Sequence, residues 1–276
     1  MQPLEIGVCT WSIDRHDPVA SLAQARNKLA LGVAQIGFFG GAAVEAADPA
    51  RIRAAAVETQ VALAAAFVGY DDQDYSSIEA LTRTGGLIPD DHWSARLDLT
   101  LRAGVVTRGL GLDKLGIHVG TIPTDRNGPA FGRLVERTQR VADGLREQGL
   151  TLLIETGPDP ADLLVTFLEA LARPNVMVNF DPANIVAYGS GDPVEAVSQL
   201  RGRVALVHVK DAVASKRPGV DWGSEVFPGT GEADIPRVIS KLRAGGYRGP
   251  LLIERRTGGG VGDIAECVEY VQSLIA

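Results

Sequence analysis

The chain has 276 residues, of which 45% are hydrophobic and 22% charged, so it has enough apolar material for a sizeable folded core. Its net charge of −7 argues against nucleic acid as a main partner, because binding to phosphates needs a basic surface. No segment approaches the roughly 18 uninterrupted apolar residues of a membrane span, and the first residues lack the basic head and apolar run of a signal peptide. We therefore expect a cytoplasmic protein with no membrane partner, in which Cys9 and Cys267 are core residues.

Short apolar runs rich in Val, Ile and Leu recur along the chain and predict β-strands. They are apolar on both faces, as expected of parallel strands that other elements cover inside and outside. The eight runs are residues 4–9, 33–39, 61–68, 114–119, 151–155, 176–181, 204–209 and 250–254.

Longer segments with helix signals separate these runs. Asp17, Asp48, Asp159 and Asp192 each precede a proline, which is typical of a helix N-cap followed by the first helical position. The longest interval, residues 69–113, predicts a surface loop or short helix and two helical segments. Strand and helix therefore alternate eight times, which favours a closed (β/α)8 TIM barrel with parallel strands, formed by residues 1–276 as a single domain. A dinucleotide-binding fold would need G-x-G-x-x-G after the first strand, but CTWSIDRHD follows it.

Side chains of the kinds that bind metals lie at the ends of four consecutive predicted strands. Glu155, Asp181 and Glu254 end strands five, six and eight, and His208 lies near the end of strand seven. In such a barrel the carboxyl ends of all strands meet at one mouth. Three carboxylates in a pocket of low dielectric repel one another, and a divalent cation removes that cost. Three oxygen ligands and one imidazole suit Mn²⁺, Mg²⁺, Co²⁺ or Zn²⁺.

Each of these residues has a plainer explanation when taken alone. An acidic residue at a strand end is often a helix N-cap or an ion-pair partner, and His208 alone would suit a buried histidine with satisfied hydrogen bonds. The repetition of the same position in four consecutive strands favours the metal site.

Alternation along the strands extends the candidate substrate site. If His208 points into the barrel, so does Lys210, two residues later. Lys210 would then bind a substrate hydroxyl, carboxylate or phosphate, and the alternative is a salt bridge to a carboxylate such as Asp211. For the same reason Arg256, two residues after Glu254, is expected to point into the mouth of the barrel.

Aromatic residues and one histidine complete the candidate substrate site. Trp11 at the end of strand one, and Phe38 and Phe39 at the end of strand two, are candidates for an apolar wall against a sugar ring, with core packing as the alternative. His118, near the top of strand four, is expected to line the pocket or hydrogen-bond a metal ligand, unless its role is structural. Trp222, in the long loop after strand seven, is a candidate lid.

Two glycine-rich loops raise the question of phosphate binding. The loops after strands seven and eight contain PGTGEAD and RRTGGGVGD, and barrels often bind phosphate there. Backbone N–H groups of residues 258–262, with Arg255 or Arg256, would suit an anion. A surface loop without a ligand is the commoner explanation.

At these residues the chain resembles the sugar phosphate isomerase/epimerase family, the xylose isomerase-like barrels. The matching segments are IETGPDPADLL, NFDPANIVAYGSGDPVEAV, HVKD and FPGTGEADIPRVISKLRAGGYRGPLLIER. Relatives include ketose 3-epimerases, hydroxypyruvate isomerases and inosose dehydratases. The resemblance implies that Glu155, Asp181, His208 and Glu254 bind one divalent metal ion, with Mn²⁺ as first choice. It also assigns the acid–base roles to Glu155 and Glu254.

One position departs from the ketose 3-epimerase pattern. Those enzymes usually have a substrate-binding histidine three residues after the metal-binding aspartate, where this chain has Asn184. Asparagine still donates and accepts hydrogen bonds, but it carries no charge. Endonuclease IV, a related barrel that cuts DNA with three zinc ions, is excluded because the chain has too few histidines and is acidic.

The resemblance and the residues together predict a metal-dependent sugar isomerase or epimerase. Its chemistry would be proton abstraction next to a carbonyl, through an enediolate that the metal stabilises. The alternatives are a keto-sugar or keto-inositol lyase or dehydratase that uses the same enolate, and a non-catalytic sugar-binding barrel. The expected partner is a small sugar or sugar derivative, and the sequence leaves open whether the chain is a homodimer.

Overall fold

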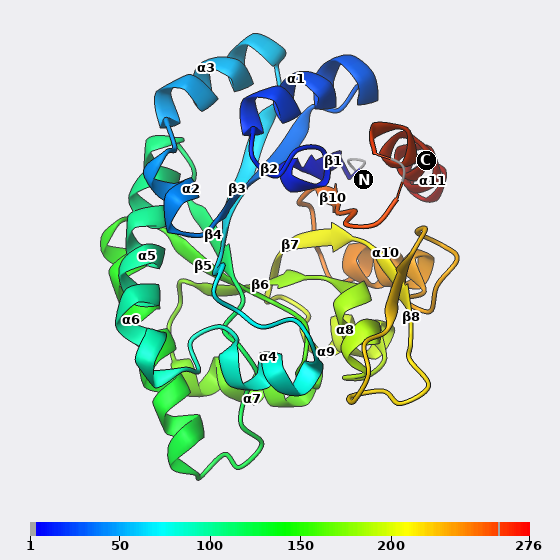
Figure 1. Ribbon diagram of the computed structural model, residues 1–276. Coiled ribbons are helices and arrows are strands. Elements are labelled where there is room, and N and C mark those ends of the chain that lie inside the picture. Colours follow the sequence, from blue (N-terminus) through cyan, green and yellow to red (C-terminus); the bar gives the residue numbers. More distant parts are fainter. Residues whose placement is uncertain (1–3, 259) are drawn as a thin grey trace.

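Eight parallel strands close into a barrel in the computed structural model, which describes residues 4–258 and 260–276 (Figure 1). Around the ring the order is β1, β10, β7, β6, β5, β4, β3, β2. All eight predicted strands are confirmed, with small changes at their ends. The strands are β1 (Ile6–Cys9), β2 (Val33–Phe39), β3 (Ala62–Gly69), β4 (Lys114–Ile117), β5 (Thr151–Glu155), β6 (Val176–Phe180), β7 (Val204–Val209) and β10 (Leu251–Ile253).

Helices surround the barrel, and the predicted TIM-barrel class is confirmed. The interval 69–113 contains a loop and two helices, α4 and α5, as expected. None of the helices in the described residues is long and apolar enough to cross a membrane. The helices are η1 (Thr10–Ser12), α1 (Pro18–Leu29), α2 (Gly41–Glu45), α3 (Pro49–Thr59), α4 (Ile78–Thr84), α5 (Asp90–Gly109), α6 (Pro129–Glu147), α7 (Ala161–Leu171), α8 (Pro182–Tyr188), α9 (Pro193–Gln199), α10 (Ile235–Ala244) and α11 (Val261–Ile275).

The strands are apolar on both faces because they separate two layers of packed side chains. One layer lies between the strands and the helices and holds most of the core. The other layer fills the inside of the barrel, below the mouth. Three of its residues lie two positions before Glu155, His208 and Glu254 along their strands, so they point to the same side as these residues. Its buried members are Cys9, Val33, Ala65, Leu153, Leu206 and Leu252.

The Asp-Pro pairs begin helices in three of the four predicted cases. The carboxylates of Asp17, Asp48 and Asp192 accept hydrogen bonds from backbone N–H groups in the first turns of α1, α3 and α9. The prediction for Asp159 is wrong. Pro160 takes the cap position of α7, and Asp159 Oδ1 instead accepts the Ile122 N–H at 2.8 Å, joining the loops after β5 and β4.

A small antiparallel hairpin after β7 was not predicted. It consists of β8 (Asp211–Val213) and β9 (Ser224–Val226), which are too short and too polar to stand out in the sequence. The buried Asp211 carboxylate organises the following loop, because it accepts four backbone N–H groups at 2.8–3.0 Å. These belong to Ala212, Gly229, Gly231 and Ala233.

Candidate metal centre

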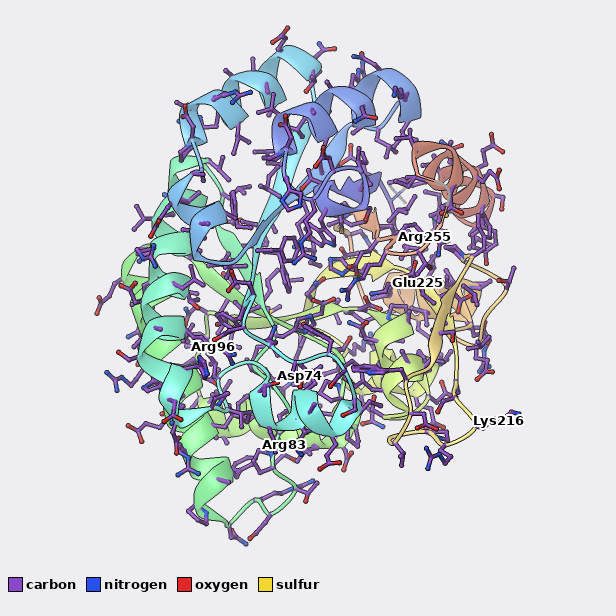
Figure 2. All side chains as sticks on the ribbon, viewed as in Figure 1. Asp74, Arg83, Arg96, Lys216, Glu225 and Arg255 are labelled. Carbon is purple, nitrogen blue, oxygen red and sulfur yellow. The ribbon has the colours of Figure 1, made fainter. Side chains whose placement is uncertain are left out.

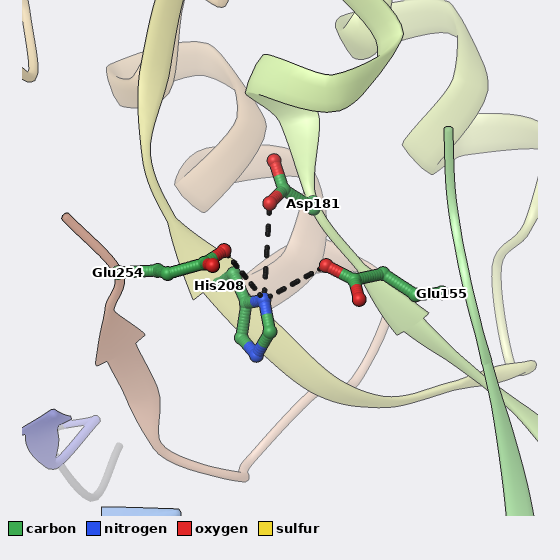
Figure 3. A group of neighbouring side chains, drawn as sticks. All are labelled: Glu155, Asp181, His208 and Glu254. Atoms are coloured by element: carbon green, nitrogen blue, oxygen red, sulfur yellow. Dashed lines mark hydrogen bonds and ion pairs between the residues drawn. The ribbon is translucent and has the colours of Figure 1, made fainter. Parts of the chain in front are cut away.

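The four residues predicted to bind a metal lie together at the carboxyl ends of β5, β6, β7 and β10. Each offers one ligand atom, and these atoms all lie within 4.8 Å of one another (Figure 3). All four residues are buried. The pairing of the strands explains why the four side chains lie at a similar height in the barrel. Glu155 pairs with Asn179, and His208 pairs with Leu252, so Glu254 lies just beyond the end of β10.

The imidazole of His208 turns one nitrogen toward the three carboxylates. His208 Nδ1 lies 3.1 Å from Glu155 Oε1, 3.3 Å from Glu254 Oε2 and 3.8 Å from Asp181 Oδ2. The other nitrogen, Nε2, lies 2.7 Å from the side-chain oxygen of Gln35 on β2. Asn179 Nδ2 lies 3.1 Å from the same nitrogen, so two side-chain amides hold Nε2, and with a cation bound the unprotonated Nδ1 would face it. This arrangement suits a metal-binding imidazole whose second nitrogen is held by the protein.

Asp181 uses its two oxygens differently. Its Oδ1 accepts the backbone N–H of Asn184 at 2.9 Å and so caps α8. Its Oδ2 faces His208 and Lys210, at 3.3 Å from the lysine Nζ. The cap and the ligand role, which sequence analysis treats as alternatives, are therefore compatible in one side chain.

Lys210 points into the site, as the alternation along β7 predicts. Its Nζ lies 3.0 Å from Glu254 Oε2 and 3.2 Å from Asn184 Oδ1. Burial disfavours the charge on this lysine, but the surrounding carboxylates outweigh burial and raise its pKa. Burial likewise opposes the charge on Glu254, yet Lys210 and His208 hold the pKa of Glu254 well below its usual range.

The donor set fits a divalent cation. Three carboxylates and one imidazole converge in a buried space, and Lys210 supplies only part of the positive charge that they require. Oxygen donors with one nitrogen are compatible with Mg²⁺, Mn²⁺, Co²⁺ or Zn²⁺. Glu155, Asp181, His208 and Glu254 are the residues that would hold it.

Hydrogen bonds orient the two glutamates. Trp11 Nε1 donates to Glu254 Oε1 at 2.9 Å, and Asn184 Nδ2 donates to Glu155 Oε1 at 3.3 Å. His118 Nε2 lies 3.1 Å from Glu155 Oε2, so His118 lies beside the site, as expected. Trp11, which the sequence suggested as an apolar wall, thus also holds a glutamate.

The mouth above the cluster is a cavity of about 230 Å³. Arg256 lines it, as predicted, and Trp11, Phe39 and Phe67 form an aromatic wall. The structure does not place Phe38 there. Strand alternation turns Phe38 outward into the layer beneath the helices, and Phe39 takes the position at the mouth.

The hairpin next to the mouth is held by a buried ion pair. Figure 2 labels Arg255 and Glu225, and Arg255 Nη1 lies 2.8 Å from Glu225 Oε1. Arg255 Nε lies 2.7 Å from Asp263 Oδ2. Because two carboxylates neutralise Arg255, it is not available to a phosphate. Trp222, the candidate lid, packs edge-on against Tyr188, with ring centroids 4.9 Å apart. Gly259, within the glycine-rich stretch 258–262, lies outside the described residues.

Sequence reasoning missed several residues of this region, among them Gln35, Phe67, Arg15 and Tyr75. Gln35 has a usable signal, because it is a polar residue in the middle of an apolar strand. Arg15 and Tyr75 line the mouth from loops, where no periodicity indicates which way a side chain points.

Comparison with known proteins places most of the barrel in one family. Residues 29–273 match the model of the xylose isomerase-like TIM barrel family. A search of curated proteins found no match. Among solved structures, a xylose isomerase domain protein from Planctomyces limnophilus is similar, with 28% identity, a TM-score of 0.87 and coverage of 99% of this chain and 98% of that one.

Two more distant structures share the fold. The D-allulose 3-epimerase from Methylomonas sp. is 18% identical, with a TM-score of 0.74 and 99% coverage of both chains. A xylose isomerase-like TIM barrel protein from Mycobacterium smegmatis, solved in complex with magnesium, is 16% identical with a TM-score of 0.72, covering 100% of this chain and 98% of that one.

Proposed function

The chain belongs to the xylose isomerase-like TIM barrel family, and we propose that it is a divalent-metal-dependent sugar isomerase or epimerase. The observation that carries the proposal is the convergence of Glu155, Asp181, His208 and Glu254 within 4.8 Å of one another at the barrel mouth. Structural neighbours that are sugar 3-epimerases support the same reaction class.

The reaction that this site suits is proton transfer at the carbon next to a carbonyl. A divalent cation held by Glu155, Asp181, His208 and Glu254 would supply Lewis acidity at the carbonyl oxygen. Glu155 takes the proton from carbon and releases it to solvent, and Glu254, which is ionised at rest, takes a proton from solvent and delivers it from the other side. Their strands, β5 and β10, are separated by β6 and β7, so the two carboxylates approach a substrate from different walls.

The remaining side chains orient these two groups and the substrate. His118 and Asn184 hold Glu155, and Trp11 holds Glu254. Lys210 donates to Asp181, Asn184 and Glu254, so it would bind a substrate oxygen only by exchanging one of these partners. The aromatic wall of Trp11, Phe39 and Phe67 offers an apolar surface to the C–H face of a sugar.

Deuterium exchange tests this proposal. In D₂O, the protein loaded with Mn²⁺ and given a panel of ketoses and aldoses should place deuterium on the carbon next to the carbonyl of an accepted sugar. Glu155→Gln should slow this incorporation at least about hundredfold, because it removes the base and leaves a side chain of the same shape. Glu136→Gln, at an exposed position on α6, is the matched control and should exchange at the normal rate.

Two outcomes would change the proposal. Incorporation of deuterium with loss of water from the sugar would reassign the same chemistry to a lyase. Absence of exchange with every sugar that binds would remove the enediolate mechanism and leave a sugar-binding protein.

A further inference from the structure

Two arginines line the mouth beside the metal cluster. Arg15 comes from the loop after η1, and its guanidinium lies over the Phe39 ring, 4.1 Å from the ring centroid. Arg256 comes from the segment just after β10, two residues beyond Glu254. Both side chains therefore face the cavity that holds the two glutamates.

Neither guanidinium is neutralised within the described residues. No carboxylate there lies within 4.0 Å of the side-chain nitrogens of Arg15 or Arg256, in contrast to Arg255, which binds Glu225 and Asp263. Arg256 uses only its backbone N–H to contact Glu225. Exposed arginines without a partner are common on protein surfaces, so the position of these two at the candidate active site is what matters.

Tyr75 adds a hydroxyl to the same wall, with its hydrogen free to donate. The side-chain oxygen of Gln73 accepts the Gly86 N–H at 2.8 Å, which fixes the orientation of the amide. The Gln73 Nε2 therefore donates to the Tyr75 oxygen, at 3.1 Å. Since this hydrogen bond uses the oxygen as an acceptor, the Tyr75 O–H can donate to a ligand. Tyr75, Arg15 and Arg256 line the same cavity.

The charge balance also favours an anionic ligand. A dication and Lys210 would neutralise the three carboxylates of the cluster. Among the residues that line the cavity, Arg15 and Arg256 then face one carboxylate at the rim, that of Asp71, while Glu225 behind Arg256 is paired with Arg255. The two guanidinium groups supply the local positive charge that an anion needs in a chain whose net charge is −7.

We propose that the substrate of the metal site carries an oxyanion, a carboxylate or a phosphate, which Arg256, Arg15 and the Tyr75 hydroxyl bind at the outer end of the mouth. The inference rests on the proposed function, and it narrows the substrate to a sugar acid or a sugar phosphate. Guanidinium groups suit this role because their planar N–H donors match the oxygens of both anions.

Ligand titration of the Mn²⁺-loaded protein tests the inference, because without the cation the three carboxylates keep the mouth negative, and the arginine variants separate binding at the rim from binding at the metal. The probes are inorganic phosphate, D-gluconate and the neutral polyol D-glucitol, followed by calorimetry at low and high salt. We expect at least one anion to bind about tenfold more tightly than D-glucitol, and this binding to weaken with salt.

Substitutions at the exposed arginines assign the binding to these side chains. Arg256→Gln and Arg15→Gln should each weaken binding of the anion about tenfold, and Arg256→Lys should restore part of the loss. Arg26→Gln, an exposed arginine near the end of α1, should have no effect. Binding of phosphate alone would indicate a sugar phosphate, and binding of D-gluconate alone a sugar acid.

Two results would overturn the inference. One is that neither anion binds more tightly than D-glucitol, and the other is that binding persists when Arg15 and Arg256 are both replaced by glutamine. The deuterium exchange experiment is independent of both results. Exchange on a neutral sugar without anion binding would remove only the inference, and anion binding without exchange would remove only the proposed function.

Discussion

Gln35 is a buried amide in the middle of an otherwise apolar strand, and burying an amide has a cost unless it makes hydrogen bonds. Its oxygen contacts His208 Nε2 at 2.7 Å and also accepts from the Cys9 thiol at 3.7 Å. Asn179 Nδ2 lies 3.1 Å from the same histidine nitrogen. With a cation bound at Nδ1, the proton of the imidazole would be on Nε2, and the Gln35 oxygen is placed to accept its hydrogen bond.

Replacing Gln35 should therefore change metal binding. We expect Gln35→Leu to weaken Mn²⁺ affinity about 10- to 100-fold, because leucine has no acceptor for the Nε2 proton. Gln35→Glu should retain most of the affinity, since a carboxylate accepts the same hydrogen bond. Calorimetric titration with Mn²⁺ measures both, and circular dichroism checks the fold. Equal affinities in the wild type and the Leu variant would show that Gln35 has no role in orienting His208.

At the scale of elements, the positions of the strands were easier to predict than the hydrogen-bond partners of individual polar residues. Runs of apolar residues located the eight barrel strands, because both faces of each strand are covered. Three Asp-Pro pairs correctly marked helix starts. Asp159 failed because its carboxylate has a competing partner in another loop, the Ile122 N–H, which no local pattern reveals.

The choice between Phe38 and Phe39 shows a second limit. The alternation rule was applied to His208 and Lys210 but not to β2, where Gln35 at an inward position predicts that Phe39 also points inward. The inward position of Phe39 could therefore have been predicted from the sequence. The β8–β9 hairpin could not have been predicted in this way, because its ordering depends on backbone hydrogen bonds to Asp211 from a distant loop.

Asp159 predicts a pH effect on the contact between the loops after β4 and β5. Burial raises its pKa to about 7 from the ordinary value of 3.8. Between these two values the folded protein binds a proton that the unfolded chain has released, so the free energy of unfolding decreases as pH rises. The slope from this residue reaches about 1.4 kcal/mol per pH unit.

Urea denaturation between pH 4 and pH 8 measures this slope. Asp159→Asn keeps the acceptor for Ile122 but cannot ionise, so it should remove the slope and be more stable than the wild type at pH 8. Asp98→Asn, at an exposed position on α5, is the matched control and should keep the wild-type slope. If Asp159→Asn shows the same pH dependence as the wild type, Asp159 is ionised in the folded protein throughout this range.

At the scale of the whole molecule, the barrel explains why four residues spread over a hundred positions meet at one point. Because β5, β6, β7 and β10 are consecutive around the ring and parallel, their carboxyl ends converge, and this could be predicted from the sequence. The surroundings of the cluster could not be predicted in the same way. They depend on loops such as residues 70–77, which brings Gln73 and Tyr75 to the mouth through contacts far apart in the chain.

The most direct test of the account is the metal content of the protein. After removal of metals with a chelator and reloading with Mn²⁺, elemental analysis should find one ion per chain. Asp181→Asn should lose most of it, because asparagine still caps α8 but brings no charge to the site. Absence of stoichiometric metal in the wild type, or equal metal in the Asn variant, would contradict the claim that these four side chains form a metal centre.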